Sequence, residues 1–291
     1  MNKYSVEQYI KFFKPEQLEN INSYVKVKEW PRNREIVAMD MGGTNFRIGR
    51  VKFDNDGKTS IDDFKKFTMP GVEEEITADE FFTFFESMKA EYSTENVALC
   101  FSYSAQILPD MRARINTFSK NIKISGAEGR ILNAAVVNDT IAALVGTRAA
   151  NMSMILGTGF NLAYSKDGII YNSECGRYVG FPCEAFDIGN MAENQVSGAF
   201  INTLIEENPD KRSLIIDRAA RIVTAEIAGI AEYAGIYDLK IAAEGSVFHK
   251  FDELRERIIY HMDCLGLNYE FLDGRDTTLI GAAVAALQPT Y

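Results

Sequence analysis

The sequence has little histidine and cysteine, no excess of positive charge and no long apolar run. Only two histidines and four cysteines occur among 291 residues. The cysteines show no C-x-x-C spacing, so we expect neither structural zinc nor disulfides. Lysine and arginine number 31 against 41 aspartates and glutamates, a net charge of -10. A chain of this charge has no basic field that would attract nucleic acid or anionic lipid.

The first twenty residues, MNKYSVEQYIKFFKPEQLEN, mix charged side chains with apolar ones. A signal peptide or a membrane span needs a continuous apolar run, so the pattern predicts a cytoplasmic protein with no membrane association. The hydrophobic fraction of 46% and the charged fraction of 25% are typical of soluble globular proteins. The length allows about two domains of ordinary size, each with its own core.

Residues 1–33 are predicted to be a helical segment, with a capping box at Ser5 and Gln8 and a second helix from Pro15 to about Val27. From residue 35 the pattern changes to strands separated by Gly and Asp-Gly turns, which is typical of a β-meander. The elements expected next are a third strand at about 61–67, a helix at 78–92, a strand at 97–103, a polar stretch to 130, a strand ending at 138 and a helix at 139–148.

The same order of elements then recurs. MDMGGTNFRIGRVKFDNDG and MILGTGFNLAYSKDG both predict a strand, a Gly/Thr turn, a strand and an Asp-Gly turn. The expected elements after the second meander are helices at about 187–207, 211–233, 252–265 and 277–287, with strands at 238–243 and 267–272. Two such α/β halves indicate a duplicated actin-like (ribonuclease H-like) fold of two domains with nucleotide and sugar in the cleft between them. The alternative is two unrelated hairpins in one α/β domain.

Glycines at hairpin tips let backbone N–H groups approach phosphates closely, and two such tips occupy matching positions of the repeat. Their residues are Gly42, Gly43, Thr44 and Asn45, with Arg47 just beyond, and Gly157, Thr158 and Gly159. One Gly-rich turn is weak evidence, because most such turns only reverse the chain. Two in matching positions favour a polyphosphate ligand. The G-x-x-x-x-G-K-[ST] phosphate loop is absent from the sequence.

Carboxylates interrupt apolar segments beside these turns. Asp40 ends an apolar strand next to the first tip, where an unpaired carboxylate is costly unless a cation or a donor meets it. Mg²⁺ carried by a nucleotide would meet it. Asn138 and Asp139 separate AAVV from TIAALV, and either residue could instead be the N-cap of the following helix. Taken singly, Glu174, Glu193 and Lys120 are more consistent with solvated surface charges than with a binding site.

These segments together resemble the hexokinase family. The resembling segments, in family order, are MDMGGTNFR (first phosphate motif), FSYSAQ (sugar segment), FSKN, VNDTIAAL (catalytic segment), MILGTGFNLAY (second phosphate motif), YNSECG and AENQVSG (glutamate segments), IAAEGSVF (adenosine motif) and LIGAAVAAL (C-terminal helix). The resemblance covers roughly residues 35–288. Ser104, Cys175 and Glu244 depart from it, at positions where the family has Pro, often an aromatic residue, and Asp. The zinc motif of the related ROK sugar kinases is missing.

The resemblance implies a role for each matching residue. The residues implied for the sugar pocket are Ser102, Ser119, Lys120, Asn138, Asp139, Asn161, Glu174 and Glu193. Those implied for ATP are Asp40, Gly43, Thr44, Asn45, Arg47 and Thr158 at the phosphates and metal, with Gly245 and Ser246 near the α-phosphate and adenosine. Asp40 would hold the Mg²⁺ of Mg-ATP through water.

The resemblance implies ATP-dependent phosphorylation of a hexose, glucose above all, at its 6-hydroxyl, with Asp139 as the general base. It implies a small domain of residues 34–138 plus 278–291 and a large domain of residues 139–277, on which residues 1–33 pack. The alternatives are a kinase for an amino sugar or an N-acetylamino sugar, and a sugar-sensing protein of the same fold that does not catalyse.

Overall fold

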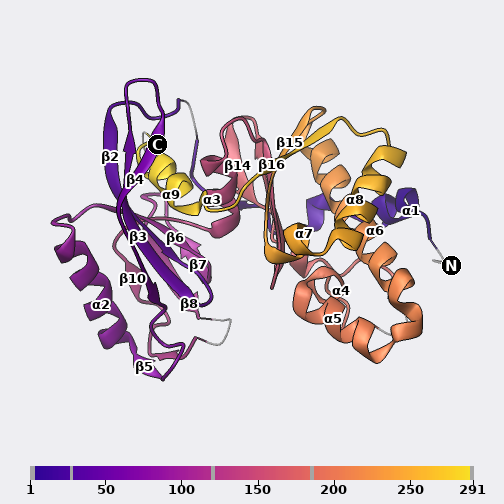
Figure 1. Cartoon of the computed structure of the whole chain (residues 1–291), viewed down its shortest axis with the longest axis horizontal. Helices are drawn as coiled ribbons and strands as arrows, with labels where there is room; N and C mark the ends of the chain where they lie inside the picture. Colours follow the sequence, from indigo (N-terminus) through magenta and orange to yellow (C-terminus); the bar gives the residue numbers. More distant parts are fainter. Residues whose placement is uncertain (1–3, 27–28, 119–121, 184–186, 289–291) are drawn as a thin grey trace. The chain divides into compact units, whose positions relative to one another are not determined.

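A computed structural model describes residues 4–26, 29–118, 122–183 and 187–288 (Figure 1). Its contacts divide the chain into two compact units. Unit 1 comprises Met1–Ile21, Ala149–Asp167 and Tyr171–Arg275, and unit 2 comprises Asn22–Arg148, Gly168–Ile170 and Asp276–Tyr291. This division differs from the boundaries expected at 34, 139 and 278, chiefly because residues 22–33 and 139–148 fall in unit 2.

Unit 2 is built on a five-stranded sheet in the order β11-β6-β2-β3-β4. Its strands are β2 (Arg34–Met41), β3 (Asn45–Phe53), β4 (Thr59–Thr68), β6 (Val97–Phe101) and β11 (Ala135–Val137). The strands β2, β3 and β4 pair antiparallel, which confirms the predicted meander, whereas β6 and β11 run parallel to β2. The last five residues of β2 are buried, and four of them are apolar, as expected of a strand covered on both faces; the exception is Asp40.

The predicted helix 78–92 is α2 (Ala78–Glu91), which a capping box of Thr77 and Glu80 opens and which buries Phe81 and Phe85. The stretch expected to be only polar up to residue 130 also contains short strands. These are β7 (Ser104–Ile107), β8 (Ala113–Thr117), β9 (Ile124–Ser125) and β10 (Ile131–Leu132), with β5 (Ile76–Thr77) pairing with β9. They were missed because they bury few side chains, two in β8, one in β10 and none in β5, β7 and β9, which is too few for a clear period.

Two helices of unit 2 pack closely although they lie far apart in sequence. They are α3 (Asp139–Gly146) and α9 (Thr278–Ala286), and α9, yellow in Figure 1, covers β6 and β2. Their contact depends on glycine, because a Cβ at Gly281 would overlap the Ala142 carbonyl and one at Gly146 would overlap the Thr277 carbonyl.

We therefore expect Gly281→Ala to lower the free energy of unfolding by about 1–3 kcal/mol, the usual cost of overpacking. Thermal denaturation followed by circular dichroism measures the effect. The matched control is Gly42→Ala, whose added methyl group would meet no atom nearer than 3.6 Å. An unchanged melting temperature for Gly281→Ala would show that the two helices can separate without cost.

Unit 1 repeats the strand arrangement of unit 2. Its sheet has the order β1-β14-β13-β12-β15-β16. The strands are β1 (Ile21–Asn22), β12 (Met152–Leu156), β13 (Phe160–Lys166), β14 (Ile169–Asn172), β15 (Leu239–Glu244) and β16 (Tyr269–Asp273). As in unit 2, the central strand β12 pairs antiparallel with the next strand of the meander and parallel with a later strand, β15. The internal duplication expected from the sequence is therefore present in the strand order.

Helices cover this sheet and enclose the core of unit 1. They are α1 (Val6–Phe12), α4 (Glu193–Val196), α5 (Gly198–Glu207), α6 (Arg212–Ala234), α7 (Ser246–Lys250) and α8 (Asp252–Cys264). The long helix α6 has 15 buried residues and packs against α1 and α8. In the described parts of the chain, no helix is both long and apolar enough to cross a membrane.

Two predicted helices were wrong in part. The helix expected from Pro15 is only a 3₁₀ turn, Pro15–Gln17, because the Asn20 side chain donates to the Pro15 carbonyl (2.9 Å) and its backbone is left-handed (φ 44°). The helix expected at 187–207 begins at Glu193 and is broken at Ser197, whose backbone is extended.

Candidate active site

Three neighbouring parallel strands of unit 2 end at one edge of its sheet. The strands β2 and β6 end opposite one another at Met41 and Phe101, and Val137 of β11 lies opposite Cys100. The residues that follow are Gly42, Ser102 and Asn138, all predicted site residues. The carboxyl edge of parallel strands is where open α/β sheets bind ligands. The fold therefore brings together three segments that lie far apart in the sequence.

The first glycine tip is held by backbone hydrogen bonds on its inner side. Gly42 N–H donates to the Asn45 carbonyl at 3.0 Å, and Met69 N–H donates to the Thr44 carbonyl at 2.9 Å. The Tyr103 hydroxyl donates to the Gly42 carbonyl. Thr44 is exposed and Gly43 is half-buried. A phosphate can thus approach the backbone of this tip from solvent.

Asp40 lies near the end of β2, two residues before this tip, and is only 4% exposed. Its carboxylate accepts from the Thr278 hydroxyl at 3.0 Å and lies 3.7 Å from the Arg47 guanidinium. Burial raises the pKa of Asp40, and Arg47 and Thr278 act against that rise. Thr278 was not predicted as a site residue; it is the first residue of α9 and directly precedes the segment that resembles the family's C-terminal helix.

The residues around Asp40 fit a metal that arrives with a nucleotide. In the described part of the chain, no group of three or more His, Cys, Asp or Glu side chains could hold a metal ion. Asp40 is an oxygen donor beside a phosphate-binding type of turn, and Mg²⁺ commonly binds through one or two carboxylates together with phosphates and water. Asp40 can therefore contribute to a magnesium site that is completed by ATP.

Asn138 and Asp139 take different positions at the start of α3. Asn138 is the N-cap of α3, and its side chain accepts from Thr140 N–H at 2.9 Å. Asp139 is the first helical residue, half-buried, and its Oδ1 accepts from the same N–H at 2.8 Å. The charge of Asp139 contributes to the raised pKa of both Asp40 and Tyr103, behind burial as the main cause. Asp139 therefore lies in the same charged cluster as Asp40.

The second glycine tip, in unit 1, packs against a third glycine. Gly157 N–H donates to the Gly159 carbonyl at 2.9 Å, and Gly198 N–H donates to the Gly157 carbonyl at 2.7 Å. Gly245 has φ 107°, and a Cβ there would overlap the Leu156 carbonyl. Only glycine fits at 245, so the turn before α7 lies directly against the tip.

A hollow of about 530 Å³ opens beside this tip. It is lined by Gly157, Thr158, Gly198, Ala199, Ile201, Asn202, Arg212, Ser246, Val247, Lys250 and Phe251. Three of these residues, Gly157, Thr158 and Ser246, were predicted to contact ATP. Arg212 lies over the Phe251 ring with its guanidinium 5.5 Å from the ring centre. The hollow thus combines apolar walls with two cations, a composition suited to a nucleotide.

Two of the predicted sugar-binding residues of unit 1, Asn161 and Glu174, belong to one hydrogen-bonded chain. The Asn161 amide donates to Asn172 at 2.7 Å, and the Asn172 amide donates to the Glu174 carboxylate at 2.7 Å. Arg177 lies 3.3 Å from the other oxygen of Glu174. Glu193 accepts from Phe160 N–H at 3.2 Å, next to the second glycine tip. Several carboxylate and amide oxygens are thereby fixed in orientation, as recognition of a polyol requires.

Two models of the hexokinase family match the chain, one over residues 5–134 and the other over residues 212–288. The chain belongs to the hexokinase family. Hexokinase from Schistosoma mansoni is 25% identical over 174 residues, which cover 50% of this chain and 39% of that protein. Hexokinase-1 from Homo sapiens is 24% identical over 254 residues, covering 74% of this chain and 26% of that protein. The chain thus matches less than half the length of these relatives.

Solved structures show the same fold. Hexokinase from Schistosoma mansoni complexed with glucose has a TM-score of 0.79 at 16% identity, covering 98% of this chain and 96% of that chain. A ROK family glucokinase from Streptomyces griseus in complex with glucose and AMPPNP has a TM-score of 0.55 at 18% identity, covering 86% of this chain and 98% of that chain. The hexokinase-family chain therefore has the two-domain actin-like kinase fold expected from its duplication.

Some site residues of this hexokinase-family chain were not predicted, and two predicted ones are not described. Ser119 and Lys120 lie outside the described residues. Asn172 was missed because an asparagine at a strand end is also a common turn residue. Arg212 and Lys250 were missed because each follows a turn or ends a short helix, where a basic residue is ordinary. Only the hollow beside the second tip brings them to one place.

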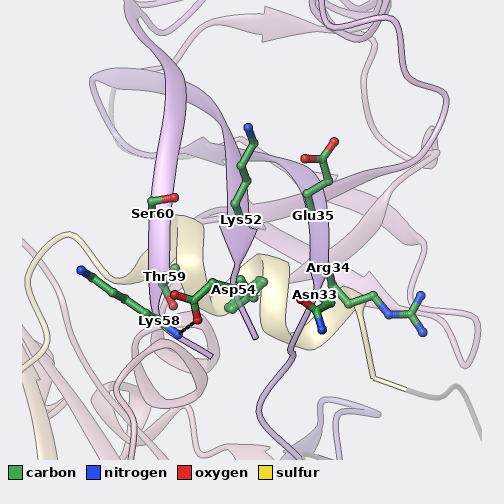
Figure 2. Close-up of a pocket in the computed structure, with 9 residues that line it drawn as sticks. Asn33, Arg34, Glu35, Lys52, Asp54, Lys58, Thr59 and Ser60 are labelled. Atoms are coloured by element: carbon green, nitrogen blue, oxygen red, sulfur yellow. Dashed lines mark hydrogen bonds between the residues drawn. The ribbon is translucent and has the colours of Figure 1, made fainter. Parts of the chain in front are cut away.

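A second hollow, of about 520 Å³, lies in unit 2 at the opposite end of β2, β3 and β4 from the first tip (Figure 2). Among the residues that line it, the Asp54 side chain accepts the backbone N–H groups of Asp56 and Lys58, and Lys52 pairs with Asp62 at 2.8 Å. None of the predicted site residues lines this hollow. Its charged groups mainly form hydrogen bonds and ion pairs within the meander itself.

Proposed function

We propose that this chain transfers the γ-phosphoryl group of ATP to the 6-hydroxyl of a hexose, with glucose as the expected substrate and Asp139 as the general base. The observation that carries the proposal is the position of Asp139 beside Asp40 and the first glycine tip, at one edge of the unit 2 sheet. Phosphoryl transfer requires a proton acceptor close to the phosphate-binding groups.

The surroundings of Asp139 suit it to accept a proton. It is the first residue of α3 and is half-buried, so its carboxylate is held at the edge of the sheet where the first glycine tip lies. The hydrogen bond from Thr140 N–H fixes one carboxylate oxygen, Oδ1, so the side chain is oriented before a substrate binds. The proton of the hexose hydroxyl would pass to this carboxylate as the oxygen attacks the γ-phosphorus. Such a base contributes about 10² to 10⁴ in rate.

The remaining predicted residues would bind the hexose and ATP and position them for the reaction. Glu174, Glu193 and Asn161 would hold hydroxyl groups of the hexose through hydrogen bonds that carboxylates strengthen. The backbone of Gly42–Asn45 and of Gly157–Gly159, with Arg47, would hold the phosphates. When bound with the nucleotide, Mg²⁺ neutralises phosphate charge, and Asp40 would hold it through water.

The test is ADP release measured with a panel of glucose, other hexoses, amino sugars and N-acetylamino sugars. Turnover of glucose or another unmodified hexose supports the proposal. Turnover restricted to an amino sugar or an N-acetylamino sugar would correct the acceptor while keeping the reaction. Calorimetric binding of a sugar without any ADP release would indicate a sensing protein and overturn the proposal.

Chelation of divalent metal is expected to abolish turnover and to leave the fold unchanged. The reason is that the described residues form no metal cluster of their own, so the metal would arrive with ATP. EDTA is added to the protein with and without ATP and hexose, and both turnover and melting temperature are recorded. A large drop in the melting temperature of the ligand-free protein would show that a metal is part of the folded structure.

A further inference from the structure

Tyr103 follows the predicted sugar-binding residue Ser102 and reaches the first glycine tip, within unit 2. Ser102 N–H donates to the Met41 carbonyl at 3.1 Å, and the Tyr103 hydroxyl donates to the Gly42 carbonyl. The sugar segment is therefore bonded to the chain at the tip through two consecutive residues.

The Tyr103 side chain is well placed to hold its acceptor. The residue is only 5% exposed, and its ring packs against Phe101 and Phe118, with ring centres 5.1 and 5.0 Å away. Burial raises the pKa of the hydroxyl, so it carries its proton at neutral pH and can donate it. Breaking this bond would leave a buried hydroxyl without that acceptor, which is costly.

The bond sets the direction of the peptide group between Gly42 and Gly43. The described residues contain no cis peptide bond, and the carbonyl and the N–H of a trans peptide point in opposite directions. Because the Gly42 carbonyl is turned toward Tyr103, Gly43 N–H points away from Tyr103. Among the described residues, Gly43 N–H donates to no other group. This donor is therefore left for a ligand at the tip, where Thr44 is exposed.

Glycine on both sides makes this peptide group easy to rotate. Neither Gly42 nor Gly43 has a Cβ that would restrict its backbone angles. The other backbone hydrogen bonds of the tip are made by other peptide groups. A rotated peptide would turn its carbonyl oxygen, and not its N–H, toward a phosphate, and the two negative partners would repel each other. The hydrogen bond from Tyr103 opposes that rotation.

We propose that Tyr103 is a positioning residue for the phosphoryl donor: its hydroxyl holds the Gly42–Gly43 peptide so that Gly43 N–H faces the phosphates. The proposal rests on the proposed function, in which this tip binds the phosphates of ATP. Tyr103 acts on nucleotide affinity through the backbone and not by contact with the nucleotide.

The test compares Tyr103→Phe with the wild type, because phenylalanine keeps the buried ring and removes only the hydroxyl. We expect the Kd of a non-hydrolysable ATP analogue, measured by calorimetry, and the KM for ATP, measured by ADP release, to rise about three- to tenfold, the size of one lost hydrogen bond. The hexose Kd should be nearly unchanged, and kcat at saturating ATP should change less than KM. Adenosine, which has no phosphate, should bind the variant as it binds the wild type.

Tyr92→Phe is the matched control. Tyr92 is also buried in unit 2, and its hydroxyl also donates to a backbone carbonyl, that of Asp63 in β4. Neither residue is a predicted site residue. Both variants should lower the melting temperature to a similar extent, but Tyr92→Phe should keep the wild-type KM for ATP. A hydroxyl with a purely structural role would lower stability without changing this KM.

The outcomes separate this inference from the proposed function. If the wild type phosphorylates a hexose, the role of Tyr103 is overturned by a wild-type KM in folded Tyr103→Phe, by an equal rise of KM in Tyr92→Phe, or by equally weakened adenosine binding. A wild type that neither binds the ATP analogue nor releases ADP with any hexose would overturn the proposed function, and the inference with it.

A second measurement on the wild type keeps the inference testable should Tyr103→Phe fail to fold. The amide resonance of Gly43 is followed by NMR while the ATP analogue or adenosine is added. We expect the Gly43 proton to shift downfield with the analogue and to stay in place with adenosine. An unchanged resonance at saturation with the analogue would show that Gly43 N–H does not face a phosphate, which overturns the role of Tyr103.

Discussion

Asp139→Asn is expected to lower kcat by about 10² or more and to leave the hexose Kd nearly unchanged. Asparagine keeps the shape of the side chain and can still accept the hydrogen bond from Thr140 N–H, so the start of α3 is preserved. The amide cannot take up the hydroxyl proton. Substrate would therefore bind while the phosphoryl transfer is slowed.

The measurement is kcat together with a direct hexose Kd, with circular dichroism to confirm the fold. Asp252→Asn is the matched control, because Asp252 is also the first residue of a helix, α8, and is an exposed residue that pairs with Arg255 of the same helix. Its kcat should equal that of the wild type. Retention of more than about a tenth of wild-type kcat by Asp139→Asn would mean that Asp139 only begins the helix and that the proposed mechanism is wrong.

Glu174→Gln and Glu193→Gln are expected to weaken hexose binding about ten- to hundredfold, because each removes a hydrogen bond to a charged group. Local geometry adds to the loss. An amide at 174 would turn an N–H group toward either the Asn172 amide or Arg177, both of which are donors. Some loss of kcat is also expected, since a loosely held acceptor is misaligned.

Direct titration of each variant with glucose measures the effect. Glu207→Gln, at the exposed end of α5, is the control for the loss of one negative charge in unit 1. If both variants bind glucose with wild-type affinity, the chain of hydrogen bonds from Asn161 to Arg177 serves the fold and not the sugar.

Much of the fold followed from local patterns. The two meanders could be predicted because strand, turn and strand are adjacent in sequence, and their glycine turns are recognisable. The five-residue burial of β2 and the near-alternating burial of β3 agree with this expectation. By contrast, the helix expected from Pro15 failed because a side-chain hydrogen bond from Asn20 competes with helix formation, which residue propensities do not reveal.

Site residues could be predicted from the sequence where a polar residue of a motif interrupts an apolar segment. They were missed where only tertiary contacts bring them to the site. Asp40 was recognised from its apolar strand, whereas its partner Thr278 lies 238 residues away. The close approach of Gly245 to Gly157 likewise joins two segments whose separate patterns indicate only turns. Such pairs form through the packing of distant elements, so a single sequence gives no local signal for them.

The packing of α9 on β2 and β6 has a consequence for synthesis on the ribosome. One face of these strands is apolar, and α9, which covers it, is translated only after all of residues 149–275. The emerging sheet of unit 2 would therefore expose that face while the rest of the chain is made. The largest segment of unit 1 is continuous from residue 171 to residue 275, so its core can close first. During that interval the unfinished sheet is the part of the nascent chain most in need of a chaperone.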